Sequence, residues 1–237
     1  MDKETIKEEV LKAYTFRHAC KVFDESKKIS EADLNYILET GRLSPSSFGM
    51  QGWRMLVITD PKLRAELKKE CWNQAQIDTS SHLVVFVTKT EALQPGTEWV
   101  KSRFADRGMP ADAQEAYYER YAGFHKNLKQ RLQGMFSRNL MSLFYGLFHA
   151  GRKGSEIYHW AAKQCYIPLG NMMSAAAMIG IDSCPLEGFD KNAVEKVLGL
   201  DTSKEEVVVL CAFGYRKNEQ PGKKRLPLEN YVERIDA

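Results

Sequence analysis

Apolar residues recur at helical spacing in three stretches of the first third of the chain. They are residues 5–16 (TIKEEVLKAYTF), 30–42 (SEADLNYILETGR) and 61–72 (PKLRAELKKECW). Ser30 followed by Asp33 resembles a capping box, which marks a helix start. Pro61 suits a first helical turn, and Gly41 is placed to end the second helix. The pattern therefore predicts three amphipathic helices.

Three short runs rich in β-branched residues predict strands. They are residues 53–60 (WRMLVITD), 82–90 (HLVVFVTKT) and 205–215 (EEVVVLCAFGY). They lack the alternation of apolar and polar side chains that a half-exposed strand shows. We therefore expect strands covered on both faces, in a buried sheet flanked by helices.

Residues 155–181 (SEIYHWAAKQCYIPLGNMMSAAAMIGI) are almost wholly apolar or small. Such a stretch is typical of a central helix that is buried on all sides. Pro168 removes one backbone donor within it and is expected to bend it. Gly170, Ser174 and the alanines at 175–177 lack bulk, so another helix can approach closely. This suits either a subunit interface or a tight contact within the chain.

The segment from Thr97 to about Ser155 is polar and aromatic, and we expect helices and a mobile loop in it. Glycines and a proline interrupt any long helical period there. These residues are Gly108, Pro110, Gly134, Gly146, Gly151 and Gly154.

The composition limits the class of protein. With 237 residues, of which 43% are hydrophobic, the chain can bury the core of one domain. A formal net charge of +3 with interspersed charges does not predict a nucleic-acid surface. No apolar run approaches the ~18 residues that a membrane span needs, and the N-terminus MDKETIKEEV is charged. We expect a cytoplasmic protein with neither a membrane nor a nucleic-acid partner.

The cysteines are odd in number and scattered, without CxxC or CxxH spacing. They are Cys20, Cys71, Cys165, Cys184 and Cys211. This pattern favours reduced thiols over a disulfide framework or a zinc site, and no metal site is predicted.

Two short basic turns lie near opposite ends of the chain. The first, residues 16–23 (FRHACKVF), carries Arg17, His18 and Lys21. The second, residues 221–227 (PGKKRLP), carries Lys223, Lys224 and Arg225. Taken alone, each is an ordinary solvated patch. If the two turns meet in the fold, they could clamp a phosphate by charge-assisted hydrogen bonds, each contributing about 1.5–3 kcal/mol.

Three polar segments lie between the basic turns. Residues 43–55 (LSPSSFGMQGWRM) offer Pro45, Ser46, Ser47 and Gln51. Residues 71–82 (CWNQAQIDTSSH) offer the amides Asn73, Gln74 and Gln76, and residues 182–190 (DSCPLEGFD) place Pro185, Glu187 and Gly188 after a short apolar strand. Alone, these are a turn and two polar loops. Amides suit the carbonyls of a polar heterocycle, and glycine permits close approach to a flat ligand.

In this order, the five segments resemble the nitroreductase family, the FMN-dependent NAD(P)H oxidoreductases, from about Phe16 to Pro227. The family pattern is an Arg-x-x-x-Lys or Arg element, a Pro-Ser-Ser-x-Asn-x-Gln-Pro-Trp turn, an amide-bearing loop, a Pro-x-Glu-Gly segment and a basic C-terminal turn. The resemblance implies an α+β, nitroreductase-like fold with a central, mainly antiparallel sheet flanked by helices, and a C-terminal extension exchanged across a homodimer. Residues 1–237 would form one domain, with a longer helical and loop excursion at about 97–155 covering the flavin site.

The resemblance also implies roles for the basic residues. Arg17, Lys223 and Arg225 would hold the FMN phosphate. His18 would lie beside the ribityl chain, and Lys21 would point at the pyrimidine edge of the flavin, near N1 and O2. A cation there stabilises the negative charge that collects at N1 on reduction. Residues four apart in an extended segment lie about 13 Å from each other on one face, so Arg17 and Lys21 can serve opposite ends of one ligand.

The amide loop and the Pro-x-Glu-Gly segment supply further contacts that the resemblance implies. Asn73 would contact the pyrimidine side of the flavin, and Gln76 stands where some relatives carry a lysine. The backbone N–H of Glu187 or Gly188 would address N5, the atom that accepts hydride. Pro185 belongs to the same cofactor-binding set. No residue is assigned as a catalyst with certainty.

The serine-rich turn departs from the family pattern. By the resemblance, Pro45 and Ser46 come from the other subunit, with Ser47 in the same turn, so the site exists only in a dimer. Gly49 stands where the pattern has Asn, and Gly52 where it has Pro. We therefore expect a loose turn and a weakened contact to the flavin across the dimer.

The leading hypothesis is an enzyme that passes hydride from NADH or NADPH through FMN to a nitroaromatic, a quinone or a similar small acceptor by a ping-pong scheme. Hydride transfer needs no general base, because the flavin supplies the redox chemistry. The alternative is a flavin-binding protein without nitroreductase turnover, such as a sensor, a store or a flavin-degrading relative, since Ala19 stands where relatives often have a phosphate-binding Ser. A third hypothesis is a dimeric interaction module that uses residues 222–225 (GKKR) as a basic patch.

Overall fold

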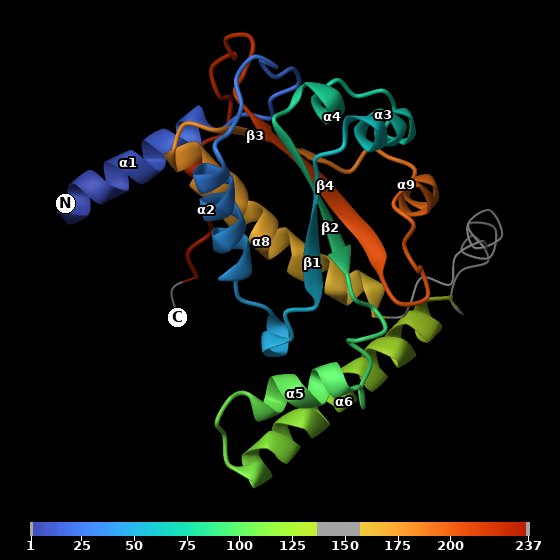
Figure 1. Cartoon of the computed structure of the whole chain (residues 1–237). Coiled ribbons are helices and arrows are strands. Elements are labelled where there is room, and N and C mark those ends of the chain that lie inside the picture. Colours follow the sequence, from blue (N-terminus) through green and yellow to red (C-terminus); the bar gives the residue numbers. More distant parts are fainter. Residues whose placement is uncertain (1, 137–156, 236–237) are drawn as a thin grey trace.

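The computed structural model describes residues 2–136, of which 127–136 by their backbone alone, and residues 157–235. Figure 1 shows a central sheet between two groups of helices, with a pair of helices standing apart below it. The elements are α1 Lys3–Phe16, α2 Glu31–Arg42, η1 Ser47–Gly49, β1 Trp53–Ile58, α3 Pro61–Glu70, α4 Gln76–Thr79, β2 His82–Thr88, α5 Glu98–Ala105, α6 Ala111–Phe136, α8 Tyr158–Met178, β3 Asp182–Leu186, α9 Lys191–Val197, β4 Glu206–Gly214 and η2 Leu228–Asn230. The three predicted amphipathic helices and the three predicted strands are confirmed.

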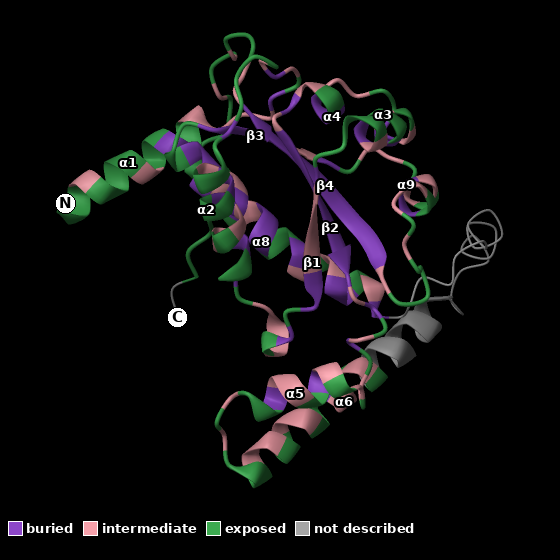
Figure 2. Cartoon of the chain, in the orientation of Figure 1, coloured by how far each residue is buried: buried purple, intermediate pink, exposed green. Residues whose placement is uncertain are grey.

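The sheet has the strand order β1-β2-β4-β3, and each neighbouring pair is antiparallel. Side chains alternate between its two faces. Leu83 and Val85 of β2 face a cluster that includes residues of α3, α4 and α9, while Val84 and Phe86 face a cluster with residues of α2 and α8. The prediction of a mainly antiparallel sheet covered on both faces is confirmed, and Figure 2 shows most of β2, β3 and β4 as buried.

Strand β3 differs from the sequence prediction. We expected Pro185 to follow a strand, but it lies inside one, paired with Cys211 of β4. The strand order explains why this is possible: β3 is an edge strand of the four-stranded sheet, and proline is tolerated there because its missing N–H is not needed on the outer side. Glu187 and Gly188 follow β3 directly, as the sequence predicts.

Helix α8 is the predicted central helix, and it continues through Pro168. It is not buried on all sides, because Tyr166, Ile167 and Met178 are exposed and a Cβ on Gly170 would meet open space. Gly41 does not end α2 as expected. It is buried inside the helix, where a Cβ would lie 2.6 Å from the sulfur of Met172, so the glycine lets α2 approach α8 closely.

Helices α5 and α6 form the predicted excursion, and they lie below the sheet in Figure 1. An aromatic cluster that includes Phe104, Tyr121 and Trp160 joins them to the start of α8. Helix α6 is 26 residues long and passes through Gly134, so this glycine does not interrupt the helix. The rest of the expected mobile loop, residues 137–155, lies outside the described residues.

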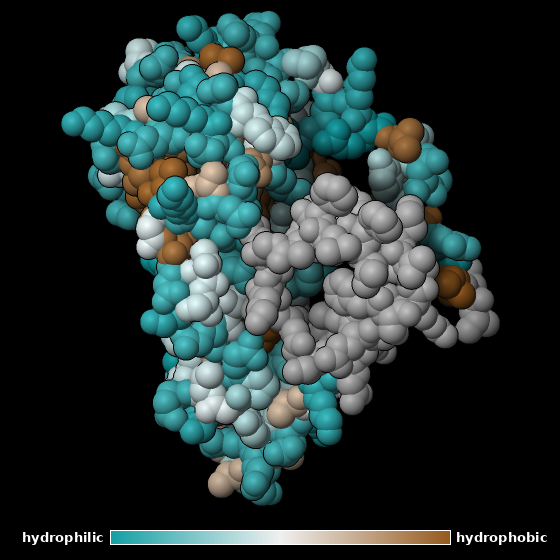
Figure 3. All heavy atoms as spheres, turned by 90° about the vertical axis from the view of Figure 1, so that its right-hand side faces the viewer, coloured by the Kyte–Doolittle hydropathy of each residue, from teal (hydrophilic) through white to brown (hydrophobic). Residues whose placement is uncertain are grey.

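The surface combines hydrophilic and apolar areas. On the face in Figure 3, apolar side chains gather mainly at the upper left, while most of the other coloured surface is hydrophilic. The C-terminal segment exposes large apolar side chains, including Leu226, Leu228 and Tyr231. No described helix is long and apolar enough to cross a membrane.

Candidate functional site

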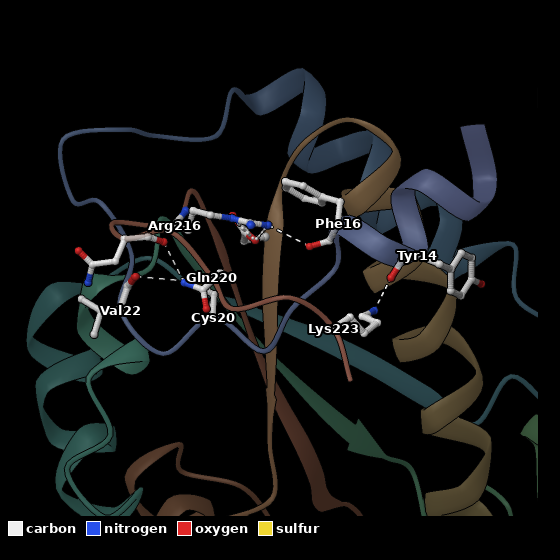
Figure 4. A network of polar contacts seen from close by, with 9 residues as sticks. Tyr14, Phe16, Cys20, Val22, Arg216, Gln220 and Lys223 are labelled. Atoms are coloured by element: carbon white, nitrogen blue, oxygen red, sulfur yellow. Dashed lines mark hydrogen bonds and ion pairs between the residues drawn. The ribbon is translucent and has the colours of Figure 1, made fainter. Parts of the chain in front are cut away.

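The two basic turns meet at the C-terminal end of α1. The Nζ of Lys223 donates a hydrogen bond to the carbonyl oxygen of Tyr14 (Figure 4). Burial, followed by the neighbouring charges of Arg17 and Arg225, lowers the pKa of Lys223 below its ordinary value. Among the described residues, none of these three cations has a carboxylate within ion-pair distance. The arrangement is a cluster of like charges that an anion would stabilise.

A buried ion pair that the sequence analysis missed fixes the position of this cluster. Asp182 at the start of β3 is only 2% exposed, and its Oδ1 accepts a hydrogen bond of 2.5 Å from Nη2 of Arg216. The same Nη2 donates to the carbonyl oxygen of Phe16 at 3.0 Å, and the guanidinium lies 4.1 Å from the Phe16 ring centroid (Figure 4). Arg216 therefore ties the end of α1, immediately before Arg17, to the end of the sheet.

The segment after α1 is extended only in part, because Lys21 and Val22 form a bend, which departs from the prediction of a continuous extended segment. Ala19 forms a β-bridge to Ser183 and Phe23 forms one to Arg216, so the segment runs beside β3. His18 is half-buried, and its carbonyl oxygen accepts a hydrogen bond from the backbone N–H of Cys20 at 3.1 Å. The β-bridges hold the backbone on both sides of Lys21.

Lys21 and Gln76 converge on one buried thiol. The Nζ of Lys21 lies 3.6 Å from Sγ of Cys184, and Nε2 of Gln76 lies 3.8 Å from the same sulfur. Burial raises the pKa of the Cys184 thiol, and the Lys21 ammonium opposes this rise. A neutral thiol is a weak acceptor, so Lys21 keeps donor capacity for another partner. Within the described part of the chain it has no ion pair.

The amide loop packs against the segment that follows β3. Trp72 and Asn73 both have left-handed backbone conformations, with φ of 55° and 54°. Nε2 of Gln74, which the sequence analysis left without a role, donates to the carbonyl oxygen of Gly188 at 2.7 Å. A Cβ on Gly188 would lie 2.7 Å from the Trp72 ring, so only glycine permits this contact. The loop and Gly188 thus form one rigid edge beside Gln76.

Glu187 connects this edge to the central helix. Its Oε1 accepts a hydrogen bond of 2.7 Å from the hydroxyl of Tyr166 on α8. Burial and this hydrogen bond raise the pKa of Tyr166 above its ordinary value. The contact holds the Glu187 side chain on α8, and because the carbonyl oxygens of Glu187 and Gly188 already accept hydrogen bonds, their backbone N–H groups are the part that can address a ligand.

The serine-rich turn lies elsewhere. Figure 1 places η1 at the lower end of β1, whereas α4, β3 and the end of α1 lie at the upper end of the sheet. Pro45 is exposed, Oγ of Ser46 accepts a hydrogen bond of 2.9 Å from the N–H of Gln51, and the N–H of Ser47 donates to Oε1 of Gln164 at 2.8 Å. One chain therefore does not bring this turn together with the other predicted site residues.

The turn is also not loose, although Gly49 and Gly52 depart from the family pattern. Nη2 of Arg107 donates to the carbonyl oxygen of Phe48, and Nε1 of Trp99 donates to that of Met50 at 2.8 Å. A Cβ on Gly52 would overlap the side chain of Leu93. Gly52 leaves room for Leu93, which precedes α5, and Gly49 leaves room for the side chain of Arg107, which follows α5.

Other chemistry finds little support among the described residues. They contain no group of three or more His, Cys, Asp or Glu side chains that could hold a metal ion. The five cysteines are free and buried, which agrees with the predicted reduced thiols. The upper end of the sheet holds a cluster of three cations that could bind an anion. Beside it lie Lys21, the neutral amides of residues 73–76 and the backbone of Gly188. This set fits a flat polar ligand with an anionic tail.

Known proteins resemble this chain in sequence. The Nitroreductase family model matches residues 14–215. YfkO of Bacillus subtilis, whose provisional name is NAD(P)H nitroreductase, is 36% identical over 234 residues, which cover 96% of this chain and 97% of YfkO.

Solved structures share the fold. The chain matches ydfN of Bacillus subtilis, provisionally named a nitroreductase, with a TM-score of 0.73 at 20% identity over 99% of this chain and 100% of the other. It matches a provisionally named nitroreductase of Exiguobacterium sibiricum, crystallised in complex with FMN, with a TM-score of 0.68 at 22% identity over 95% and 97% of the two chains.

Proposed function

This chain belongs to the nitroreductase family, and we propose that it is an FMN-dependent enzyme that passes hydride from NADH or NADPH to a nitroaromatic, a quinone or a similar small acceptor. The observation that carries the proposal is the meeting of two basic turns, far apart in the sequence, with no carboxylate partner for Arg17, Lys223 or Arg225 among the described residues. Such a cluster suits the single terminal phosphate of FMN. A dinucleotide element of the Gly-x-Gly-x-x-Gly type does not occur in the sequence.

The residues at the upper end of the sheet fit the rest of the cofactor. His18 lies in the segment between the phosphate cluster and Lys21, where the ribityl chain would run. Lys21 would face the pyrimidine edge, because its one acceptor among the described residues, the Cys184 thiol, is weak. Asn73 would supply a neutral donor there, and Gln76, whose Nε2 donates to Oε1 of Gln74 at 2.9 Å, would present its amide oxygen. When bound, FMN supplies the site that takes up and releases hydride.

The protein contributes position and electrostatics. The Lys21 ammonium stabilises negative charge at the edge it faces, and Gly188 permits close approach of its backbone N–H, and that of Glu187, to a flat ring. Pro185 fixes the backbone that leads into this edge. No proton has to be moved by a side chain for hydride transfer, which fits a sequence in which no Ser/His/Asp or Cys/His set stands out. A ping-pong order follows if NAD(P)H and the acceptor use the same face in turn.

We also propose a homodimer in which Pro45, Ser46 and Ser47 of one subunit complete the site of the other. Two observations support it. The turn and the basic cluster lie at opposite ends of one chain. Helix α8 and the C-terminal segment expose large apolar side chains, which include Ile167 and Leu228 and which a partner would cover. Exchange of the C-terminal extension would bury that segment. The cytoplasmic location and the absence of nucleic-acid and membrane partners stay predictions.

The test is the visible spectrum of the purified protein, recorded without oxygen before and after NADH and NADPH are added separately. We expect a flavin spectrum that either nucleotide bleaches rapidly and that a quinone or nitroaromatic restores. Heat-released cofactor should have the mass of FMN, and the mass of FAD would contradict the phosphate assignment. A yellow protein that neither nucleotide bleaches would favour the flavin-binding alternative, and a colourless protein would favour the interaction module.

A further inference from the structure

We propose that Arg107 takes the place of the asparagine that the family pattern has at position 49, and that its guanidinium contacts the FMN bound by the partner subunit. This inference rests on the proposed function. It concerns a residue of the α5–α6 excursion that no sequence motif marks.

The first observation is the space beside Gly49. A Cβ built on this glycine would lie 2.7 Å from Nη2 and 3.5 Å from Cζ of Arg107. The backbone at Gly49 has φ of 56°, a left-handed conformation that asparagine adopts more readily than most residues. The backbone alone therefore does not exclude the family's asparagine. The Arg107 guanidinium occupies the direction in which that side chain would leave the turn, so an asparagine at position 49 would displace it.

The second observation is how firmly the guanidinium is held. Nε of Arg107 donates to the carbonyl oxygen of Arg103 at 3.2 Å, and Nη2 donates to that of Phe48. The guanidinium also lies 5.1 Å from the ring centroid of Phe104 and 4.9 Å from that of Tyr117. These contacts fix a planar cation at the turn before any ligand arrives, which lowers the cost of ordering it on binding.

The third observation is that the cation keeps binding capacity. Within the described residues, Arg107 has no carboxylate partner and Nη1 has no acceptor. The nearby Asp106 is committed to Arg103, with Nη2 of that arginine 2.5 Å from Oδ2. A half-buried guanidinium with unspent donors is well suited to oxygen acceptors of an anionic ligand.

The turn and the excursion are also packed against each other. Phe48 packs edge-on against Tyr121, with 5.2 Å between ring centroids, and Trp99 binds the carbonyl oxygen of Met50. If the Pro45 and Ser46 end of this turn reaches the partner's flavin, Arg107 reaches it as well. Arg107 would then make the contact that the family pattern assigns to the asparagine at position 49, with a positive charge in place of a neutral amide.

This difference in charge gives the test a readout that a purely structural role would not move. A cation beside the flavin stabilises the negative charge that reduction adds, so it raises the midpoint potential, whereas an amide does so less. The variants are Arg107→Ala, Arg107→Gln, the double variant Gly49→Asn/Arg107→Ala, and the control Lys101→Ala. Lys101 is an exposed cation of α5 paired with Glu98.

The measurements are the dissociation constant of FMN, from fluorescence on dilution of the holoenzyme, and the flavin midpoint potential at saturating FMN. We expect Arg107→Ala to weaken FMN binding about tenfold or more, since a charge-assisted hydrogen bond is lost, and Lys101→Ala to bind as the parent does. The double variant should recover most of the affinity, because asparagine now has room, but at a lower potential than the parent. Arg107→Gln, which can keep the bond to Phe48, should also lower the potential.

Two results would overturn the inference: FMN binding by folded Arg107→Ala as tight as that of Lys101→Ala, or an unchanged potential in Arg107→Gln. Should Arg107→Ala fail to fold, the Arg107→Gln potential decides alone. A parent protein that carries no FMN would instead contradict the proposed function, so the two failures are distinguishable.

Discussion

The two ends of the sheet hold their polar groups in opposite ways. At the upper end, β-bridges and a buried ion pair fix the backbone around Arg17 and Lys21, and the cations there have no carboxylate partners among the described residues. At the lower end, the turn at Ser46–Gly49 is held by aromatic packing and by one arginine, Arg107, that binds its carbonyl oxygen. The upper end is a cluster of cations on a backbone that is held in place. The lower end is a turn that packs mostly on apolar side chains.

The difference indicates how the site is divided. The cations proposed to meet the phosphate and the ring edge of the cofactor lie where β-bridges and the Asp182–Arg216 ion pair hold the backbone. The turn at the lower end packs against the α5–α6 excursion, which would cover the cofactor. The sequence of this turn departs from the family pattern at Gly49 and Gly52. We therefore expect the upper end to supply most of the affinity for FMN, and the lower end to add contacts from the partner subunit that change both the affinity and the midpoint potential.

The largest effect should come from breaking the anchor at the upper end. Arg216→Ala leaves Asp182, which is 2% exposed, without its partner, and removing one member of a buried pair costs about 3 kcal/mol or more. Urea denaturation should show this loss in the free energy of unfolding. The control is Arg42→Ala, which breaks an exposed pair with Glu39 and should cost at most about 1 kcal/mol. Equal losses would refute the special role of the anchor.

The next effect concerns the phosphate cluster. Arg17→Ala and Arg225→Ala should each weaken FMN binding by roughly 10- to 150-fold, since each would remove a charge-assisted hydrogen bond. The matched control is Lys224→Ala, which removes an exposed charge from the same turn. The FMN retained after gel filtration measures the difference. If Lys224→Ala loses as much FMN as Arg225→Ala, the cluster acts only through its net charge.

A substitution of Lys21 should change the midpoint potential of the cofactor without releasing it. Lys21→Ala should leave FMN bound but lower its midpoint potential by roughly 30 mV, which corresponds to about 1.4 kcal/mol for a two-electron couple. Spectroelectrochemical titration measures this shift, with Lys28→Ala as the control, because Lys28 is an exposed lysine in the loop before α2. A variant that loses FMN while its potential stays unchanged would show that Lys21 anchors rather than tunes.

The smallest effect lies at the lower end, in the pH dependence of stability. Burial lowers the pKa of His125, which packs on Tyr121 and Trp160, from 6.5 to about 4. Between these values the unfolded chain binds a proton that the folded chain does not, so stability is present above pH 6.5 and is lost as the pH falls towards 4. His125→Phe should remove about 1 kcal/mol of the change between pH 7 and 5.5. An unchanged pH profile in thermal unfolding would contradict this.

Local signals in the sequence were sufficient for most of the fold. The amphipathic period at 30–42 and the β-branched run at 82–90 gave α2 and β2, because each pattern reports the face that its own element buries. The strand at Asp182–Leu186 was misplaced, since Pro185 argues against a strand unless the strand is known to lie at an edge. The role of Gly41 was missed for a similar reason: its neighbour Met172 is distant in sequence.

The site was predictable only in part. The basic turns around Arg17 and Lys223 stand out by charge, and the structure brings them together. The pair Asp182 and Arg216 carries no local signal, because one residue of each sign at the ends of two strands looks like ordinary surface charge. Arg107 could be found only through the space beside Gly49, which no single-sequence pattern reports. The sequence alone therefore does not predict contacts between segments that are far apart in the chain.

The central claim is that each site combines the upper end of one subunit with the lower end of the other. Mixed dimers test it directly. One subunit carries Arg17→Ala, and the other carries Ser46→Glu, which places a negative charge at the turn; the two are co-expressed with different affinity tags and purified through both. One site of the mixed dimer would then contain both defects, and the other would contain neither. The account predicts one FMN per mixed dimer, bound as tightly as in the parent, at a dilution where both variant homodimers are colourless. A mixed dimer that is as colourless as the homodimers would contradict it.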